Sequence, residues 1–170
     1  MPIAITVEDG SGVADANSYV SIEDAREYAA NRGYVLSDED DVVAAQLIRA
    51  FDYIEAKECE FQGERIYIES AFPRRDVRIN GVDLPVNRIP SLLIAAQVQL
   101  AIAQLNGIDI MPNFVAADYV TKEKVGPLET TYADPLLVGI APKLGAVDAM
   151  LKPLFGRCAS GGMGIRTVRV

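Results

Sequence analysis

The 170-residue chain contains no histidine and no tryptophan, and it has only two cysteines. Without histidine, the commonest general base and metal ligand is absent, and neither a Ser-His-Asp triad nor a Cys-His pair can form. Cys59 and Cys158 lie far apart in no metal or redox spacing, which favours buried thiols over a disulfide. These absences predict that the protein is not an enzyme and carries no metal or other cofactor.

Long apolar runs are also missing. No run approaches the roughly 18 residues that a membrane span needs. The first residues, MPIAITVEDG, include acids and lack the basic n-region of a signal peptide. We therefore expect no membrane association and a location in the cytoplasm of the cell that makes the protein.

Basic residues are few: 16 Lys and Arg stand against 24 Asp and Glu, for a net charge of −8. Nucleic-acid affinity comes largely from the counterions that Lys and Arg release, so a general DNA-coating role is disfavoured. The local positive patch is the trio Arg74, Arg75 and Arg78, close to Phe72. Arg and Phe are also typical of protein interfaces, where Pro73 would hold the segment extended. A solvated loop with no contact role is the third interpretation.

Two helices are expected in the first third of the chain. Ser21 with Asp24 three residues later resembles a capping box, which predicts a helix over 22–31 that ends at Gly33. Ser37 precedes a run of acids, Asp38 to Asp41, which suits the positive start of a helix better than a cation site. Apolar residues at helical spacing extend this second helix to about residue 57.

Two further helices are expected later, with irregular and extended segments around them. One helix begins at Pro90-Ser91 and closes at Gly107, and a short one covers 146–156. Segment 61–90 is predicted to be a loop in which Asn80-Gly81 forms a tight turn. The stretch DYVTKEKVGPLETTYA alternates on both sides of Gly126-Pro127, which indicates two strands or an extended arm.

The predicted fold class is therefore mainly α: a small bundle of about four helices with an extended β-like arm or hairpin and extended termini. Its parts are an N-terminal arm over 1–20, a helical domain over 21–156 and a flexible tail over 157–170. Loop 61–90 and arm 118–133 belong to the helical domain. Strand-forming pieces without a partner sheet suggest pairing with another chain.

Several stretches, taken together and in order, resemble a known family. They are DANSYVSIEDAREYAANRG, AAQLIRAFDYIE, FQGERI, AFPRRDVRINGVDLPVNRIPSLLIAAQVQLA, VTKEKVGPLETTY and VDAMLKPLF. This set is similar to the head-to-tail connector, or adaptor, proteins of tailed bacteriophages, a family also catalogued as DnaT-like single-stranded-DNA-binding proteins. Phe72 stands where many relatives have tryptophan.

The resemblance implies a structural protein of the virion neck. Such adaptors form a ring, commonly of twelve copies, under the portal protein, receive a stopper or tail-completion protein, and let genomic DNA pass without specific binding. The interface candidates that follow are Phe72, Pro73, Arg74, Arg75, Arg78, Lys122, Lys124, Tyr132, Ile165, Val168 and Val170.

The alternative function is a DnaT-like replication accessory protein that binds single-stranded DNA. It needs a basic groove with aromatic side chains on which bases stack. The net charge of −8 and the absence of tryptophan count against it. An enzyme is the third and least favoured function.

Overall fold

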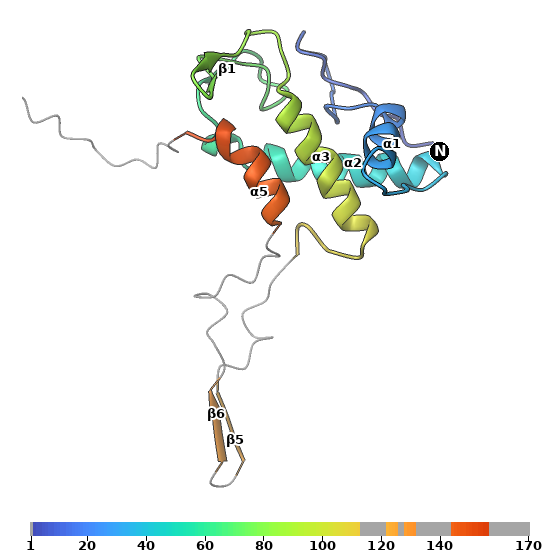
Figure 1. Cartoon of the computed structure of the whole chain (residues 1–170), viewed down its shortest axis with the longest axis vertical. Helices are drawn as coiled ribbons and strands as arrows, with labels where there is room; N and C mark the ends of the chain where they lie inside the picture. Colours follow the sequence, from blue (N-terminus) through green and yellow to red (C-terminus); the bar gives the residue numbers. More distant parts are fainter. Residues whose placement is uncertain (1, 113–121, 126–127, 132–143, 157–170) are drawn as a thin grey trace, which may run out of the picture.

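Four α-helices and three two-stranded antiparallel sheets form the regular structure of the described residues (Figure 1). The computed structural model describes residues 2–112, 122–125, 128–131 and 144–156. The helices are α1 (Ile22–Ala30), α2 (Asp40–Glu55), α3 (Ser91–Leu105) and α5 (Gly145–Leu151), with 3-10 turns η1 (Glu58–Glu60) and η3 (Lys152–Leu154). The strands are β1 (Glu64–Arg65), β2 (Arg74–Arg75), β3 (Arg78–Ile79), β4 (Val82–Asp83), β5 (Lys122–Val125) and β6 (Leu128–Thr131).

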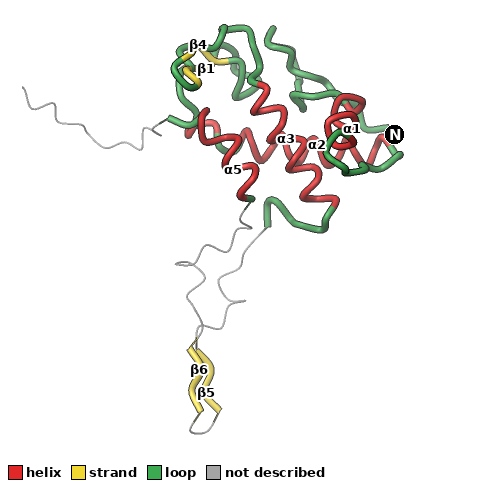
Figure 2. Tube along the Cα trace, in the orientation of Figure 1, coloured by secondary structure: helices red, strands yellow, loops and turns green. Residues whose placement is uncertain are grey.

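The fold is a small mixed α/β domain, so the expected mainly α bundle is wrong. Segment 61–90 contains two of the sheets, β1-β2 and β3-β4, and β5 pairs with β6 as the alternation around Gly126-Pro127 predicted. Each strand therefore has a pairing partner within the chain. Figure 2 shows how short the strands of segment 61–90 are beside the helices and loops. Their hydrogen bonds depend on tertiary placement, which a period-2 sequence pattern cannot reveal in two-residue strands.

The first 20 residues fold back on themselves rather than extending away. Val7 and Ser18 form a parallel bridge, and the amide of Glu8 donates to the carbonyl of Ser18 over 2.8 Å. Glu8 is buried, and its carboxylate accepts from the amides of Gly10, Gly12 and Val13. A carboxylate that accepts three backbone hydrogen bonds is well satisfied away from water.

Helices α1 and α3 lie close to the positions that the sequence predicted. The Ser21 hydroxyl caps α1 by accepting from the Asp24 amide over 3.1 Å, and Gly33 follows with φ +79°. The second helix begins at Asp40, later than expected, because the Ser37 hydroxyl accepts from the Glu39 amide in a turn before it. Ser and Asp side chains often favour such turns over a helix interior.

Helix α3 lies at the centre, between α1 and α5, and it crosses α2 (Figure 1). Its side chains enter two hydrophobic clusters, with Leu93 and Leu100 in one and Val98 and Ile102 in the other. Gln97 is fully buried between them. Its side chain accepts from the Tyr19 amide and donates to the Ser18 hydroxyl and the Leu47 carbonyl. A buried amide with three partners fixes α2 and the N-terminal segment on α3.

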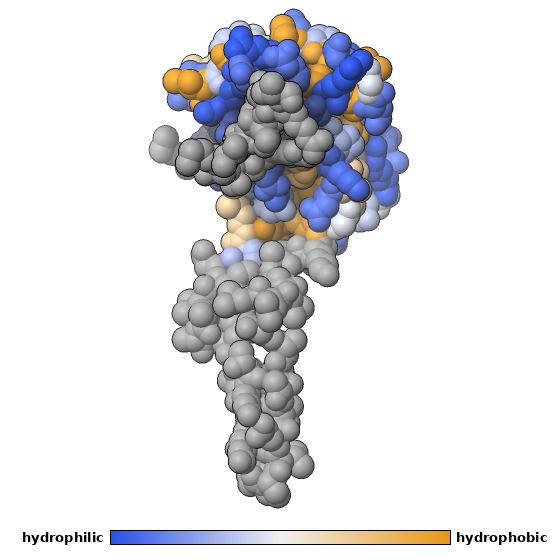
Figure 3. Space-filling view, turned by 90° about the vertical axis from the view of Figure 1, so that its left-hand side faces the viewer, coloured by the Kyte–Doolittle hydropathy of each residue, from blue (hydrophilic) through white to orange (hydrophobic). Residues whose placement is uncertain are grey.

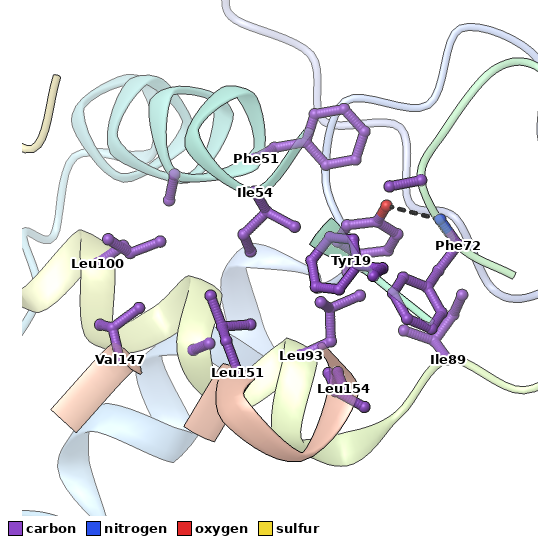
Figure 4. Packing of buried hydrophobic residues seen from close by; sticks show 14 of the residues in the cluster. Tyr19, Phe51, Ile54, Phe72, Ile89, Leu93, Leu100, Val147, Leu151 and Leu154 are labelled. Atoms are coloured by element: carbon purple, nitrogen blue, oxygen red, sulfur yellow. Dashed lines mark hydrogen bonds between the residues drawn. The ribbon is translucent and has the colours of Figure 1, made fainter. Parts of the chain in front are cut away.

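Tyr19 and Glu55 join segment 61–90 to the helices. The Tyr19 hydroxyl donates to Glu55 Oε1 over 2.5 Å. It also accepts from the Phe72 amide over 3.2 Å, and Figure 4 draws this second bond as a dashed line. Glu55 Oε2 accepts from the Ala71 amide over 2.7 Å. Burial raises the pKa of the Glu55 carboxyl above its usual value, although the hydrogen bonds from Tyr19 and Ala71 oppose this effect. Burial likewise raises the pKa of Tyr19.

The raised pKa of Glu55 predicts a pH-dependent stability. Folded Glu55 holds its proton to higher pH than the unfolded chain does, so its contribution to stability is fully present below the unfolded pKa, roughly 4.3. That contribution is lost as pH rises through the folded pKa. Urea unfolding should be measured for the wild type and Glu55→Gln from a pH below the unfolded pKa of Glu55 to a pH above its folded pKa. The wild type should lose stability relative to the variant as pH rises.

Glu69→Gln is the control, because Glu69 is exposed and its carboxylate makes no hydrogen bond within the described residues. The control should follow the wild type at every pH. Parallel pH profiles for the wild type and Glu55→Gln would contradict the role given to Glu55.

Candidate nucleic-acid interface

Segment 61–90 is built on its two small sheets. Strands β1 and β2 place Glu64 opposite Arg75. Gly63, just before β1, has φ +74°, and a Cβ there would lie 2.0 Å from the Arg75 carbonyl oxygen, so only glycine fits. Asn80 and Gly81 connect β3 to β4 with φ of 51° and 85°. The tight turn predicted at this Asn-Gly pair is confirmed.

Phe72 and Pro73 lie inside the domain. Phe72 is fully buried, and its ring meets that of Phe61 edge to face, with 5.1 Å between the centroids. Pro73 is also buried and follows a cis peptide bond. Both residues pack within this chain and leave no exposed contact surface.

Arg74 is also internal, with 4% of its surface exposed. Its guanidinium donates to the carbonyls of Gln62 (2.8 Å), Gly63 (2.9 Å), Ala71 (3.1 Å) and Phe61 (3.4 Å). It also forms a 2.9 Å ion pair with Glu58. A planar group with five fixed donors can satisfy this many carbonyls at once, whereas lysine cannot. Arg74 thus closes the segment and is not available to an external phosphate.

Arg75 and Arg78 are exposed, but acidic partners already neutralise them. Arg75 pairs with Glu64 across β1-β2, and Arg78 Nε lies 3.3 Å from Asp83 across β3-β4. The hydrogen bond from Arg75 lowers the pKa of Glu64. The basic trio of the sequence is therefore three ion pairs in the folded protein.

The other predicted contact residues fall in or beyond the β5-β6 hairpin. Lys122 and Lys124 lie on β5, where Lys122 is in register with Thr131 and Lys124 with Glu129. Four candidates lie outside the described residues: Tyr132, Ile165, Val168 and Val170.

Three cations within residues 2–112 and 144–156 remain without a carboxylate partner there, a feature that sequence reasoning missed. Seven ion pairs hold Arg26, Arg49, Lys57, Arg65 and the trio, whereas Arg32, Arg88 and Lys152 form none with any described residue. All three are exposed. Nothing in their sequence neighbourhoods marked them, because pairing depends on which carboxylates the fold brings near. They are the described cations best able to accept a new anionic partner.

Exposed aromatic and aliphatic side chains accompany these charges. Tyr34 and Tyr67 are 40% and 38% exposed, and Ile68 and Val82 project from segment 61–90. Figure 3 shows hydrophilic residues over much of the described surface in its view, with hydrophobic residues interspersed and gathered near the lower edge. Exposed tyrosines provide faces on which bases can stack.

Other chemical sites are not apparent in the described ranges. These residues contain no group of three or more Cys, Asp or Glu that could hold a metal ion. None of the helices described here is both long and apolar enough to cross a membrane. Cys59 is exposed and disulfide-bonded, so the buried thiol expected there is wrong.

The arrangement defines a small domain with a neutralised basic loop and a few uncommitted cations and tyrosines. Comparison with known protein families shows which family the chain belongs to. Residues 3–170 match the family described as "Putative DnaT-like ssDNA binding protein". The chain belongs to this DnaT-like family. No curated protein and no solved structure shows significant similarity to the chain.

The family match corrects the expected function. Its description is single-stranded-DNA binding, which corresponds to the alternative, and it gives no support to a phage head-to-tail connector. The connector interpretation relied on ordered short motifs that the two descriptions share, so those motifs could not separate them. The ring partners and virion location followed only from that interpretation and stay untested.

Because Arg74 is buried and Arg75 is exposed, we expect their replacement to lower the stability of the protein by different amounts. Arg74→Ala leaves buried carbonyls without donors and should lower the free energy of unfolding by about 2–4 kcal/mol. Arg75→Ala removes only an exposed pair and should cost less than about 1 kcal/mol. Urea titration followed by circular dichroism measures both. Equal losses for the two variants would show that Arg74 is not the closing residue of the segment.

Proposed function

We propose that the protein binds single-stranded DNA as a non-enzymatic binding protein. The observation that carries this proposal is the family match over residues 3–170, nearly the whole chain. The match covers the helices, segment 61–90 and the β5-β6 hairpin together, so it concerns the domain as a unit.

The charge distribution supports binding through few phosphate contacts. The net charge of −8 opposes a strand lying anywhere on the surface. Arg32, Arg88 and Lys152 are the described side chains with an uncommitted positive charge. A small number of phosphate contacts combined with base stacking would give binding that is local and readily reversed.

The same features favour single strands over duplex DNA. Bases of a single strand expose faces that can stack on tyrosine or arginine, whereas the bases of a duplex are stacked on each other. Duplex binding relies more heavily on rows of cations along the backbone. The described surface offers exposed tyrosines and few free cations, which suits a flexible single strand.

This proposal predicts measurable binding to a fluorescein-labelled oligo-dT at low salt, followed by fluorescence anisotropy. The affinity should fall with salt, with a log-log slope of about −0.7 per phosphate contact, hence roughly −2 for three contacts. A duplex of equal length should bind more weakly. The full chain is used throughout.

Two kinds of result would count against this proposal. Absence of binding at low salt, or equal affinity for duplex and single strand, would overturn the proposed function. A salt slope near zero with tight binding would contradict the part assigned to phosphate contacts.

A further inference from the structure

A hollowed face runs along α3, with α1 on one side and α5 on the other. It consists of two hollows of about 410 and 180 Å³. Leu92 and Ala95 line the larger hollow, with Ser91 and Ile94 beside them, and Gln99, Ile102, Ala103 and Asn106 line the smaller one. Leu92, Ala95, Gln99, Ile102 or Ala103, and Asn106 follow helical spacing, so the two hollows lie along one stripe. From Leu92 to Asn106 the helix rises about 21 Å at 1.5 Å per residue. We call this face, with its flanking residues from α1 and α5, the α3 groove.

The walls of the α3 groove come from segments remote in sequence. Tyr28 and Arg32 border the larger hollow, and Tyr34 borders the smaller one. Across from them, Met150 borders the larger hollow, and Val147 with its neighbours borders the smaller one. The two hollows therefore have the same order of walls along α3.

No carboxylate lines either hollow of the α3 groove, although the chain has 24 acidic residues. Another hollow, beside α2, contrasts with this pattern, because Asp41 and Arg49 both line it. Burial raises the pKa of Tyr53 of α2, and the charge of Asp148 on α5 adds to this rise, so Asp148 acts toward α2. Within the described residues, the α3 groove is thus a non-acidic face on an acidic protein.

One of the uncommitted cations lies at the larger hollow. Arg32 lines it directly. Arg88 precedes the lining residue Ser91 by three positions, and Lys152 follows the lining residue Met150 by two. Since consecutive Cα atoms are 3.8 Å apart, both lie within about 12 Å along the chain from a lining residue. Arg32 is therefore the cation that lines this end of the α3 groove, and Arg88 and Lys152 are near it along the chain.

Two flat groups face the groove from the α1 side. The Arg32 guanidinium carbon lies 3.4 Å from the centroid of the Tyr28 ring, and Arg32 Nη1 donates to the Tyr28 carbonyl over 3.0 Å. This holds the guanidinium in place without neutralising it. The Tyr34 ring follows two residues later and is 40% exposed. Guanidinium planes and tyrosine rings are the groups on which unpaired bases stack.

We propose that the α3 groove is the track for the single strand, with one base on the Arg32–Tyr28 pair and a neighbouring base on Tyr34. The inference rests on the proposed function and specifies its site. Leu92 and Met150 would give the bases an apolar floor, Gln99 and Asn106 are amides able to meet base edges, and Arg88 and Lys152 would contact phosphates. The basic trio of segment 61–90 plays no part in this site.

The test compares Arg32→Ala/Tyr34→Ala with a loop variant, Arg75→Ala/Ile68→Ala. Each pair removes one exposed arginine and one exposed large side chain, and Ile68 has no ring on which a base could stack. Oligo-dT binding by fluorescence anisotropy should weaken by about 5- to 150-fold for each stacked base lost from the groove. The loop variant should bind within about twofold of the wild type. Urea unfolding checks that both variants keep the wild-type stability.

A second readout covers the case in which the groove variant is unstable. Ultraviolet crosslinking of wild-type protein to oligo-dT, with mass spectrometry of the peptides, should place the strand on residues 28–34 and 146–152. Crosslinks confined to segment 61–90 would overturn the inference.

The results distinguish this inference from the proposed function. If the wild type binds oligo-dT and the groove variant binds equally well, the α3 groove is not the track, while the proposed function stands. A groove variant that changes only the native mass would instead assign the face to a second copy of the chain, which also overturns the inference. If the wild type does not bind at all, the proposed function itself fails.

Discussion

The hydrogen bond between Tyr19 and Glu55 is the constraint on which the rest of the structure depends. It places a residue just before α1 against the last turn of α2, and the free acceptor positions of both side chains then receive the amides of Phe72 and Ala71. Three segments remote in sequence therefore meet at one buried polar pair. Since an unpaired buried polar group is costly, none of them can move away alone.

Segment 61–90 owes its order to this pair and to Arg74. Once Phe72 is held in the core, the Arg74 side chain reaches back to four carbonyls and Glu58. These bonds replace the regular ladders that a strand or helix would supply, because the β-strands of the segment are only two residues long. An apparently irregular loop can thus be rigid when one guanidinium satisfies its backbone.

Sequence patterns predicted what depends on near neighbours. The Ser21 cap, the Gly33 stop and the Asn80-Gly81 turn are all settled within a few residues, and each was located correctly. Arg74 shows why other features were missed: its partners are backbone carbonyls up to 13 residues away, which no side-chain pattern marks. The candidate interface was harder still. It depends on which of the many acids meets each cation and on how α1 and α5 flank α3.

The distribution of ion pairs also bears on how an acidic protein could bind DNA in the way we propose. Acids that pair with Arg75 and Arg78 remove the positive potential of the loop, and unpaired acids repel phosphates from most of the surface. The α3 groove has no carboxylate in its lining and one arginine. Because the acidic surface around it repels phosphates, a single strand would bind in the groove rather than elsewhere on the protein. If the strand binds in the α3 groove as we propose, its affinity would depend on stacking more than on charge, and it could leave after losing only a few contacts.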